Sequence, residues 1–130
     1  MMIKQLSVFL QNQLGRREEL TGVLLEHDIN ISALSVAETA EYGVMRMIVS
    51  DTEKAEKVLR EKDFSVKLTD VICIVAPDVP GSLHKTLALL AAEGINVSYM
   101  YGYSSEGKAR LVLKVSDPTR AQAVIEKAGF

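Results

Sequence analysis

The chain has 130 residues, of which 48% are hydrophobic and 25% are charged, a composition typical of a soluble globular protein and not of a disordered one. Its net charge is −2 and its 15 basic residues are spread along the sequence, so we expect no nucleic-acid partner, which would need a basic stripe. Cys73 is the only cysteine, which excludes an intrachain disulfide and a cysteine-based zinc cage and favours the reducing cytoplasm.

Membrane and export signals are not recognisable. No apolar run approaches the roughly 20 residues that span a bilayer. The segment from Met1 to Lys4 lacks the charged region and apolar block of a secretory signal. We therefore expect no membrane partner.

The first half of the chain alternates between strand and helix patterns. Residues 6–10 alternate apolar and polar, which predicts a half-buried strand, and Asn12-Gln13-Leu14-Gly15 is a turn signal. A helix with one buried face follows, from the spacing of Leu20, Val23, Leu24 and His27. The further predicted elements are strands at 29–37 and 44–49, a helix capped by Ser50-Asp51-Thr52 that buries Ala55, Val58 and Leu59, and an extended segment at 64–68.

The second half follows the same order. Residues 71–76 predict a strand, and Asp78-Val79-Pro80-Gly81 is the next turn. A helix ending at Gly94 follows. The further predicted elements are strands at 96–103 and 110–115 and a last helix that Ser116-Asp117-Pro118 caps and that buries Ala121, Val124 and Ile125.

The halves are related by an offset of 66 residues, which matches Gly15 to Gly81, Ile29-Asn30 to Ile95-Asn96, Ser50-Asp51 to Ser116-Asp117 and Phe64 to Phe130. This duplication predicts two domains, residues 1–68 and 69–130. The first is βαββαβ and the second lacks the last strand. Such units favour an α+β, ferredoxin-like fold with antiparallel sheets and both helices on one face. The continuous segment 64–76 is a candidate to serve both units, and the missing strand leaves an edge that must be shortened, covered or paired.

The strand from Val71 to Val75 is apolar at every position, so both of its faces need cover. Neighbouring loops are one source of that cover. Another sheet or another subunit is the alternative, and it predicts a further two-fold contact, a homodimer.

Candidate catalytic groups are few. His27 closes an apolar helical face, His84 lies in the first turn of a helix, and Cys73 lies in an apolar strand, where a thiol behaves as a small hydrophobe. None has the base and the orienting group that nucleophilic catalysis requires. We therefore predict no catalytic residue, no metal site and no cofactor.

The repeated turn is the remaining candidate. Each copy leads into a helix N-terminus, where free N–H groups and the helix dipole attract a small anion. Asn12 and Asp78 lie beside it, and the Asp78 carboxylate suits a ligand ammonium, so the combination fits an amino-acid zwitterion. The alternative is that Asn12 and Asp78 only cap their helices.

The sequence resembles the ACT-domain family of small-molecule regulatory modules, over nearly the full chain and twice. The resemblance is carried in the second half by Asp78-Val79-Pro80-Gly81-Ser82-Leu83, Glu93-Gly94-Ile95-Asn96-Val97 and Val115-Ser116-Asp117-Pro118, and more loosely in the first by Asn12-Gln13-Leu14-Gly15, Asp28-Ile29-Asn30-Ile31 and Val49-Ser50-Asp51. It implies βαββαβ units and an amino acid held between the turn of one unit and the second strand of its neighbour.

Carried over by position, the resemblance implies a ligand-binding set of turn residues and of second-strand asparagines. Leu14 replaces the usual proline of the turn, and Arg17 stands where the second half has Leu83. The implied set is Asn12, Leu14, Gly15, Asn30, Asp78, Pro80, Gly81 and Asn96.

Three functional hypotheses follow. The first is a non-enzymatic, amino-acid-binding regulatory module, allosteric if the ligand prefers one of two states. The second is a structural or regulatory subunit that docks a metabolic enzyme without binding a ligand. The third is a small enzyme in which Arg46 and Arg110, with Asn30 or Asn96, polarise a phosphate ester, but no general base is evident for it.

Overall fold

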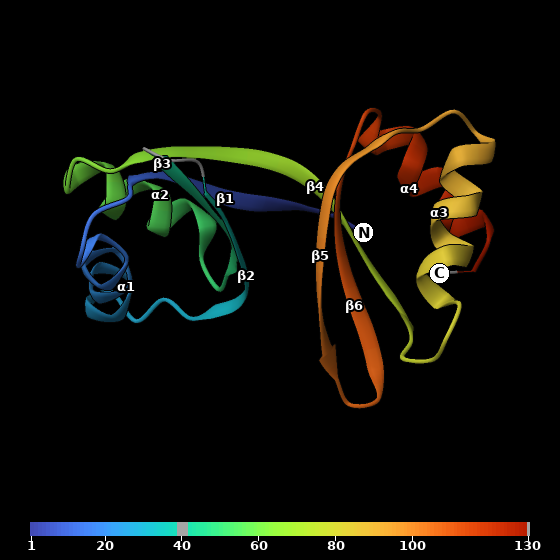
Figure 1. The fold of residues 1–130 in the computed structure, drawn as a ribbon, viewed down its shortest axis with the longest axis horizontal. Coiled ribbons are helices and arrows are strands. Elements are labelled where there is room, and N and C mark those ends of the chain that lie inside the picture. Colours follow the sequence, from blue (N-terminus) through green and yellow to red (C-terminus); the bar gives the residue numbers. More distant parts are fainter. Residues whose placement is uncertain (39–41, 130) are drawn as a thin grey trace. The chain divides into compact units, whose positions relative to one another are not determined.

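The computed structural model describes residues 1–38 and 42–129. The fold is α+β, as predicted, and the same succession of strands and helices occurs twice (Figure 1). The described elements are β1 (Met2–Gln11), α1 (Arg16–Glu26), β2 (Ile31–Glu38), β3 (Tyr42–Val49), α2 (Thr52–Glu61), β4 (Ser65–Pro77), α3 (Ser82–Ala92), β5 (Val97–Ser105), β6 (Lys108–Val115) and α4 (Pro118–Lys127).

The chain divides into two compact units. The first comprises Lys4–Thr69, and the second comprises Asp70–Phe130 together with Met1–Ile3. Two strands, β1 and β4, therefore give residues to both units. The continuous β4 is the segment that the sequence analysis identifies as a candidate to serve both.

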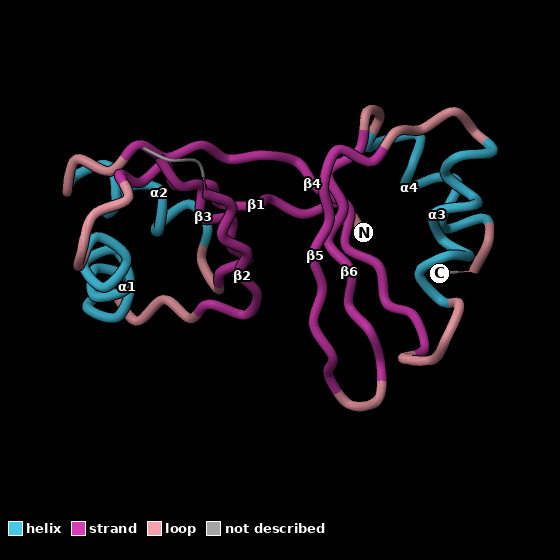
Figure 2. The backbone as a smooth tube through the Cα atoms, viewed as in Figure 1, coloured by secondary structure: helices cyan, strands magenta, loops and turns pink. Residues whose placement is uncertain are grey.

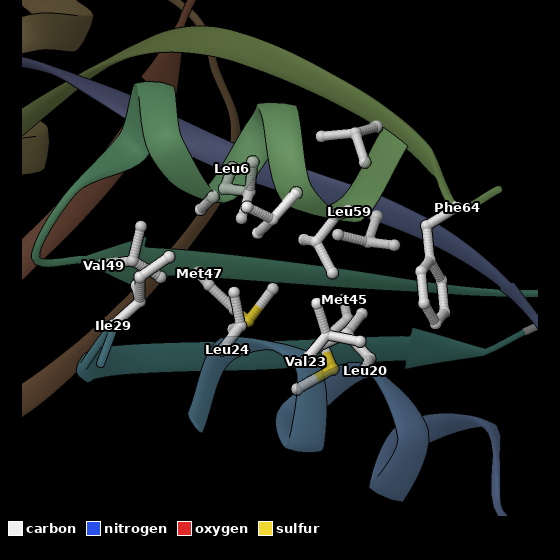
Figure 3. Close-up of a cluster of buried hydrophobic side chains, with 14 of the residues drawn as sticks. Leu6, Leu20, Val23, Leu24, Ile29, Met45, Met47, Val49, Leu59 and Phe64 are labelled. Atoms are coloured by element: carbon white, nitrogen blue, oxygen red, sulfur yellow. The ribbon is translucent and has the colours of Figure 1, made fainter. Parts of the chain in front are cut away.

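In the first unit the strand order is β2-β3-β1-β4, the ferredoxin-like arrangement. Leu6 stands opposite Met47 and Val8 stands opposite Met45 in an antiparallel register, so these side chains share one face of the sheet. Helices α1 and α2 cover that face (Figure 3). They bury the residues that the helical spacing predicts, Leu20, Val23, Leu24, Ala55, Val58 and Leu59.

In the second unit β6 pairs antiparallel with both β4 and β5. The core lies between this sheet and the helices α3 and α4 and is built around Ile72, Leu90 and Leu113, each fully buried. The apolar strand at 71–75 has Ile72 and Ile74 on the side of this core, whereas Val75 on the opposite side is 37% exposed.

Up to residue 129, the last that the structure describes, the second unit has no last strand of its own, as predicted, and the first residues of the chain occupy that position. The Cys73 N–H donates to the Met1 carbonyl at 2.8 Å, and the Met1 ammonium donates to the Cys73 carbonyl at 2.8 Å. This reciprocal exchange is typical of an antiparallel pair. Met2 packs against the second core. The edge left by the missing strand is thus paired, and the N-terminus lies beside β4 (Figure 1).

The predicted caps of α2 and α4 are confirmed. Asp51 Oδ1 accepts from the Lys54 N–H, and Asp117 Oδ1 accepts from the Arg120 N–H, each at 3.1 Å. Both bonds satisfy an N–H group that the helix itself leaves without a partner.

We expect Asp51→Ala to lower the free energy of unfolding by about 1 kcal/mol, because the capping acceptor is lost. Asp51→Ser keeps a capping oxygen and should recover most of that loss. Urea denaturation of the two variants and the parent chain measures both values. Equal stability of Asp51→Ala and the parent would show that the cap contributes nothing.

Candidate functional site

Two turns of the same form join a strand to a helix, one turn in each unit (Figure 2). Gly15 ends the first turn and Gly81 ends the second, with φ of +85° and +90°. A side chain in this left-handed region costs roughly 1–2 kcal/mol, which explains glycine at both positions. The backbone reverses in the same way, since Gln13 N–H donates to the Gln11 carbonyl at 2.8 Å and Val79 N–H to the Pro77 carbonyl at 2.9 Å.

The hypothesis that Asn12 and Asp78 cap these helices is wrong. The N-cap residues are Gly15 and Gly81, and neither helix has a hydrogen bond from its first turn to a capping side chain. Asp78 instead accepts a hydrogen bond through Oδ2 from the Ser104 hydroxyl at 2.8 Å. Its carboxylate is therefore fixed to the end of β5.

Each turn borders an open hollow. The first measures about 640 Å³ and is lined by Asn12, Gln13, Leu14, Gly15, Arg17 and Glu18. The second measures about 350 Å³ and is lined by Pro77, Val79, Pro80, Gly81, Ser82 and Lys85. Leu14 is fully exposed at its turn. These sizes are comparable to those of small-molecule sites.

The side chains around the two turns differ in charge. In the first unit the Arg17 guanidinium forms an ion pair with Glu38, at the end of β2. The second unit has Leu83 in place of Arg17 and Ser104 in place of Glu38 under the 66-residue offset. The end of the second strand thus contacts the turn region in both units, through an ion pair in the first unit and through a hydrogen bond in the second.

Asn30 and Asn96 lie at the other end of the sheet from the turn of their own unit. The backbones of both residues pair with serines, Asn30 N–H with Ser50 Oγ at 2.9 Å and Asn96 N–H with Ser116 Oγ at 3.1 Å. On β3 the register sets Gln11 opposite Tyr42 but Ile31 opposite Val49, which is about 23 Å along the strand at its usual rise. Within one unit the structure therefore does not bring the asparagine and the turn together.

The enzymatic hypothesis requires an arginine beside an asparagine, and the register separates the two within each described unit. Arg110 stands opposite Tyr103, whereas Asn96 precedes Val97, which stands opposite Val115. That separation is about 16 Å along β6. In the first unit Arg46 stands opposite Ser35, whereas Asn30 precedes Ile31, which stands opposite Val49, about 10 Å along β3. Each arginine thus lies several residues along the sheet from the asparagine of its own unit.

The two histidines, the remaining candidate catalytic groups, lie on helices. His27 Nδ1 lies 2.9 Å from the Val23 carbonyl at the end of α1, and His84 is exposed on α3. Within residues 1–38 and 42–129, no group of three or more His, Cys, Asp or Glu side chains is placed to hold a metal ion. Across the same ranges, no helix is long and apolar enough to cross a membrane.

Burial raises the pKa of the Cys73 thiol, although the N-terminal ammonium and Arg110 act in the opposite direction. At a given pH less of the reactive thiolate is present, so we expect iodoacetamide to alkylate Cys73 several times more slowly in the folded chain than in the chain unfolded by urea. Mass spectrometry of timed samples at pH 8 measures both rates. Equal rates would contradict the account of this thiol.

Sequence reasoning missed Ser104 and Glu38 as neighbours of the turns. The sequence analysis names their partners, Asp78 and Arg17, and the 66-residue offset relates Glu38 to Ser104. The repeat does not predict that the end of the second strand contacts the turn region of its own unit. That contact depends on the antiparallel register.

Comparison with protein families gives one match, to the model of the ACT domain pair, over residues 1–129. No curated protein matches the chain. The match extends over both units and includes both turns.

Two solved structures illustrate the likeness. A protein of Bacteroides thetaiotaomicron is 44% identical, with a TM-score of 0.95, and the alignment covers 98% of this chain and 89% of that one. The ligand-free regulatory subunit of aspartate kinase from Thermus thermophilus is 16% identical, with a TM-score of 0.70, and the alignment covers 100% of this chain and 98% of that one. At that identity the second likeness supports the fold alone.

Proposed function

Because the chain belongs to the family of ACT domain pairs, we propose that it is a non-enzymatic regulatory module that binds an amino acid at the repeated turn. The observation that carries this proposal is the pair of glycine-ended turns whose helices have no side-chain cap, each beside a hollow of small-molecule size. Backbone N–H groups at such a helix start suit the ligand carboxylate.

In this proposal the turns contribute Asn12, Leu14 and Gly15 in the first unit and Asp78, Pro80 and Gly81 in the second. Asn30 and Asn96 are far from the turn of their own unit, so they complete a site on another ACT unit. The proposal therefore includes association of ACT units, with a homodimer as its simplest form. Light scattering on the full chain tests this part, and a monomer mass at every concentration would contradict it.

The regulatory part of the proposal draws on the fold shared with regulatory subunits of aspartate kinase. A metabolic enzyme is the partner class that this role requires. Ligand binding changes such a partner only if the amino acid binds one state of the assembly more tightly than another.

Isothermal titration calorimetry against each of the twenty amino acids tests the ligand. We expect one or a few of them to release heat and to raise the melting temperature of the full chain, because a ligand that binds only the folded state stabilises it. If none of the twenty amino acids at millimolar concentration releases heat or raises the melting temperature, the proposal is wrong.

The second hypothesis, an enzyme-docking subunit that binds no ligand, is favoured by the partly exposed Val75 on the apolar strand. Affinity capture from native extract separates the two. Stoichiometric capture of an enzyme, unchanged by any amino acid, favours the docking subunit, whereas capture that an amino acid strengthens or weakens favours the proposed module.

A further inference from the structure

Helix α3 is poor in charge for a helix at the surface of its unit. Lys85 is the only charged residue among its eleven, whereas α1, of the same length, has five. Ala88, Ala91 and Ala92 on its outer face are nevertheless exposed. A surface helix normally has charged and polar residues on that face, and a helix that is apolar all round is normally buried. The outer face of α3 is therefore suited to contact with another protein surface.

Residues four positions apart form one row along a helix. His84, Ala88 and Ala92 form such a row on α3, and all three are exposed. The row has no carboxylate and no long aliphatic side chain. A second helix can therefore approach it closely, because the side chains at the contact set the distance between two packed helices.

The equivalent row of α1 under the 66-residue offset consists of Glu18, Gly22 and Glu26. It borders a hollow of about 490 Å³ that Glu19 and Lys62 also line, so three carboxylates and one ammonium group surround this hollow. Gly22 leaves a notch in the middle of the row, since a Cβ built there meets nothing within 4 Å. The outer row of α1 is thus acidic at both ends and open at its centre.

An antiparallel contact between α1 of one chain and α3 of a second chain matches the two rows. With Gly22 opposite Ala88, Glu26 comes opposite His84, one turn away from the crossing on each helix, where an imidazole N–H can donate to the carboxylate. Leu25 is 79% exposed beside this row and would be covered by the alanine face of α3. The antiparallel direction also sets opposite ends of the two helix dipoles side by side.

Contacts between like helices are less favourable. Two α1 rows in the same antiparallel arrangement set Glu18 of each chain opposite Glu26 of the other, and like charges at such positions repel. Two α3 rows set alanine against alanine and bury no side chain as large as Leu25, so less apolar area is removed from water. Charge and side-chain size therefore favour the contact between unlike helices.

We infer that the chain associates with a second copy of itself through α1 of one chain and α3 of the other. This inference does not depend on amino-acid binding, and it goes beyond the proposed function, which requires association of ACT units but assigns no helix surface to it. The contact covers one face of each helix and is small, so we expect it above roughly 10 μM chain and not in dilute solution.

Sedimentation velocity on the full chain, from about 5 to about 500 μM, tests the contact. The mass of the parent should rise with concentration. Ala88→Glu sets a carboxylate against the acidic row of α1, and Gly22→Arg fills the notch, so each variant alone should need at least roughly tenfold more chain to associate. Ala123→Glu, the same change at an exposed position of α4, is the matched control and should associate like the parent.

Mixing the two variants separates the contact of unlike helices from the other arrangements. An equimolar mixture of Ala88→Glu and Gly22→Arg should associate again, because the unaltered α1 of the first variant meets the unaltered α3 of the second. Thermal melting by circular dichroism shows that each variant is folded. Gly22 and Ala88 have exposed surroundings, so both variants should melt as the parent does or slightly above it.

The outcomes distinguish this inference from the proposed function. If the parent associates and either variant alone does so equally well, or if the mixture fails to associate, the inference is wrong while the proposed association of ACT units stands. A parent chain that stays monomeric over the whole range contradicts both the inference and the proposed association. Amino-acid binding is decided separately, by calorimetry.

Discussion

Met2→Asp is expected to destabilise the second unit by roughly 3 kcal/mol, because it places a charge against an apolar core. Met2 lies at the start of the sequence, yet it packs with residues from the second half of the chain. The loss of stability should therefore affect residues that are far from Met2 in the sequence.

Hydrogen exchange read by mass spectrometry locates the effect. We expect faster exchange in β6 of the second unit and a smaller change in β3 of the first. Gln11→Asp, an exposed substitution at the other end of β1, is the control and should leave both strands protected. A change confined to the first unit would contradict the assignment of Met1–Ile3 to the second.

Leu24→Ala is expected to lower the free energy of unfolding by about 3 kcal/mol, since it removes a large side chain from the first core and leaves a cavity. Leu24 is 1% exposed, whereas its neighbour Leu25 is 79% exposed. Leu25→Ala should therefore change stability by no more than about 0.5 kcal/mol.

Urea denaturation of these two variants compares the same chemical change one residue apart on α1. A large difference is the predicted result. Similar losses from both, or a greater loss from Leu25→Ala, would mean that α1 presents a different face to the core than the one in Figure 3.

Much of the fold follows from local patterns in the sequence. The helical spacing of Leu20, Val23 and Leu24 identifies the buried face of α1, because only that face repeats its apolar residues at helical intervals. The caps at Asp51 and Asp117 are recognisable since they depend on residues three positions apart. The internal repeat then predicts that the same succession of strands and helices occurs in both halves of the chain.

The strand that completes the second unit was not predictable in this way. Pairing between Met1 and Cys73 joins residues 72 positions apart, and no local pattern encodes such a contact. The sequence indicates only that an edge needs cover. The geometry shows which residues supply it.

In the candidate site, too, the local features could be predicted from the sequence and the contacts between distant residues could not. Gly15 and Gly81 are evident as turn residues, because a left-handed backbone demands glycine. The sequence leaves the role of Asp78 open between a helix cap and a ligand acceptor, and the N-cap position of Gly81, with no side-chain cap on α3, rules out the cap. Whether Asn30 and Asn96 meet a ligand remains a prediction, since it depends on the contacts of one unit with another.

The measurement that tests the central claim most directly is a nuclear magnetic resonance titration of the ¹⁵N-labelled full chain with the amino acid that calorimetry identifies. We predict that the amide signals at the start of a turn-led helix, those of Gly15 and Arg16 or those of Gly81 and Ser82, shift in a saturable way. A titration that leaves the signals of both turns unchanged, while signals elsewhere shift, would contradict the account.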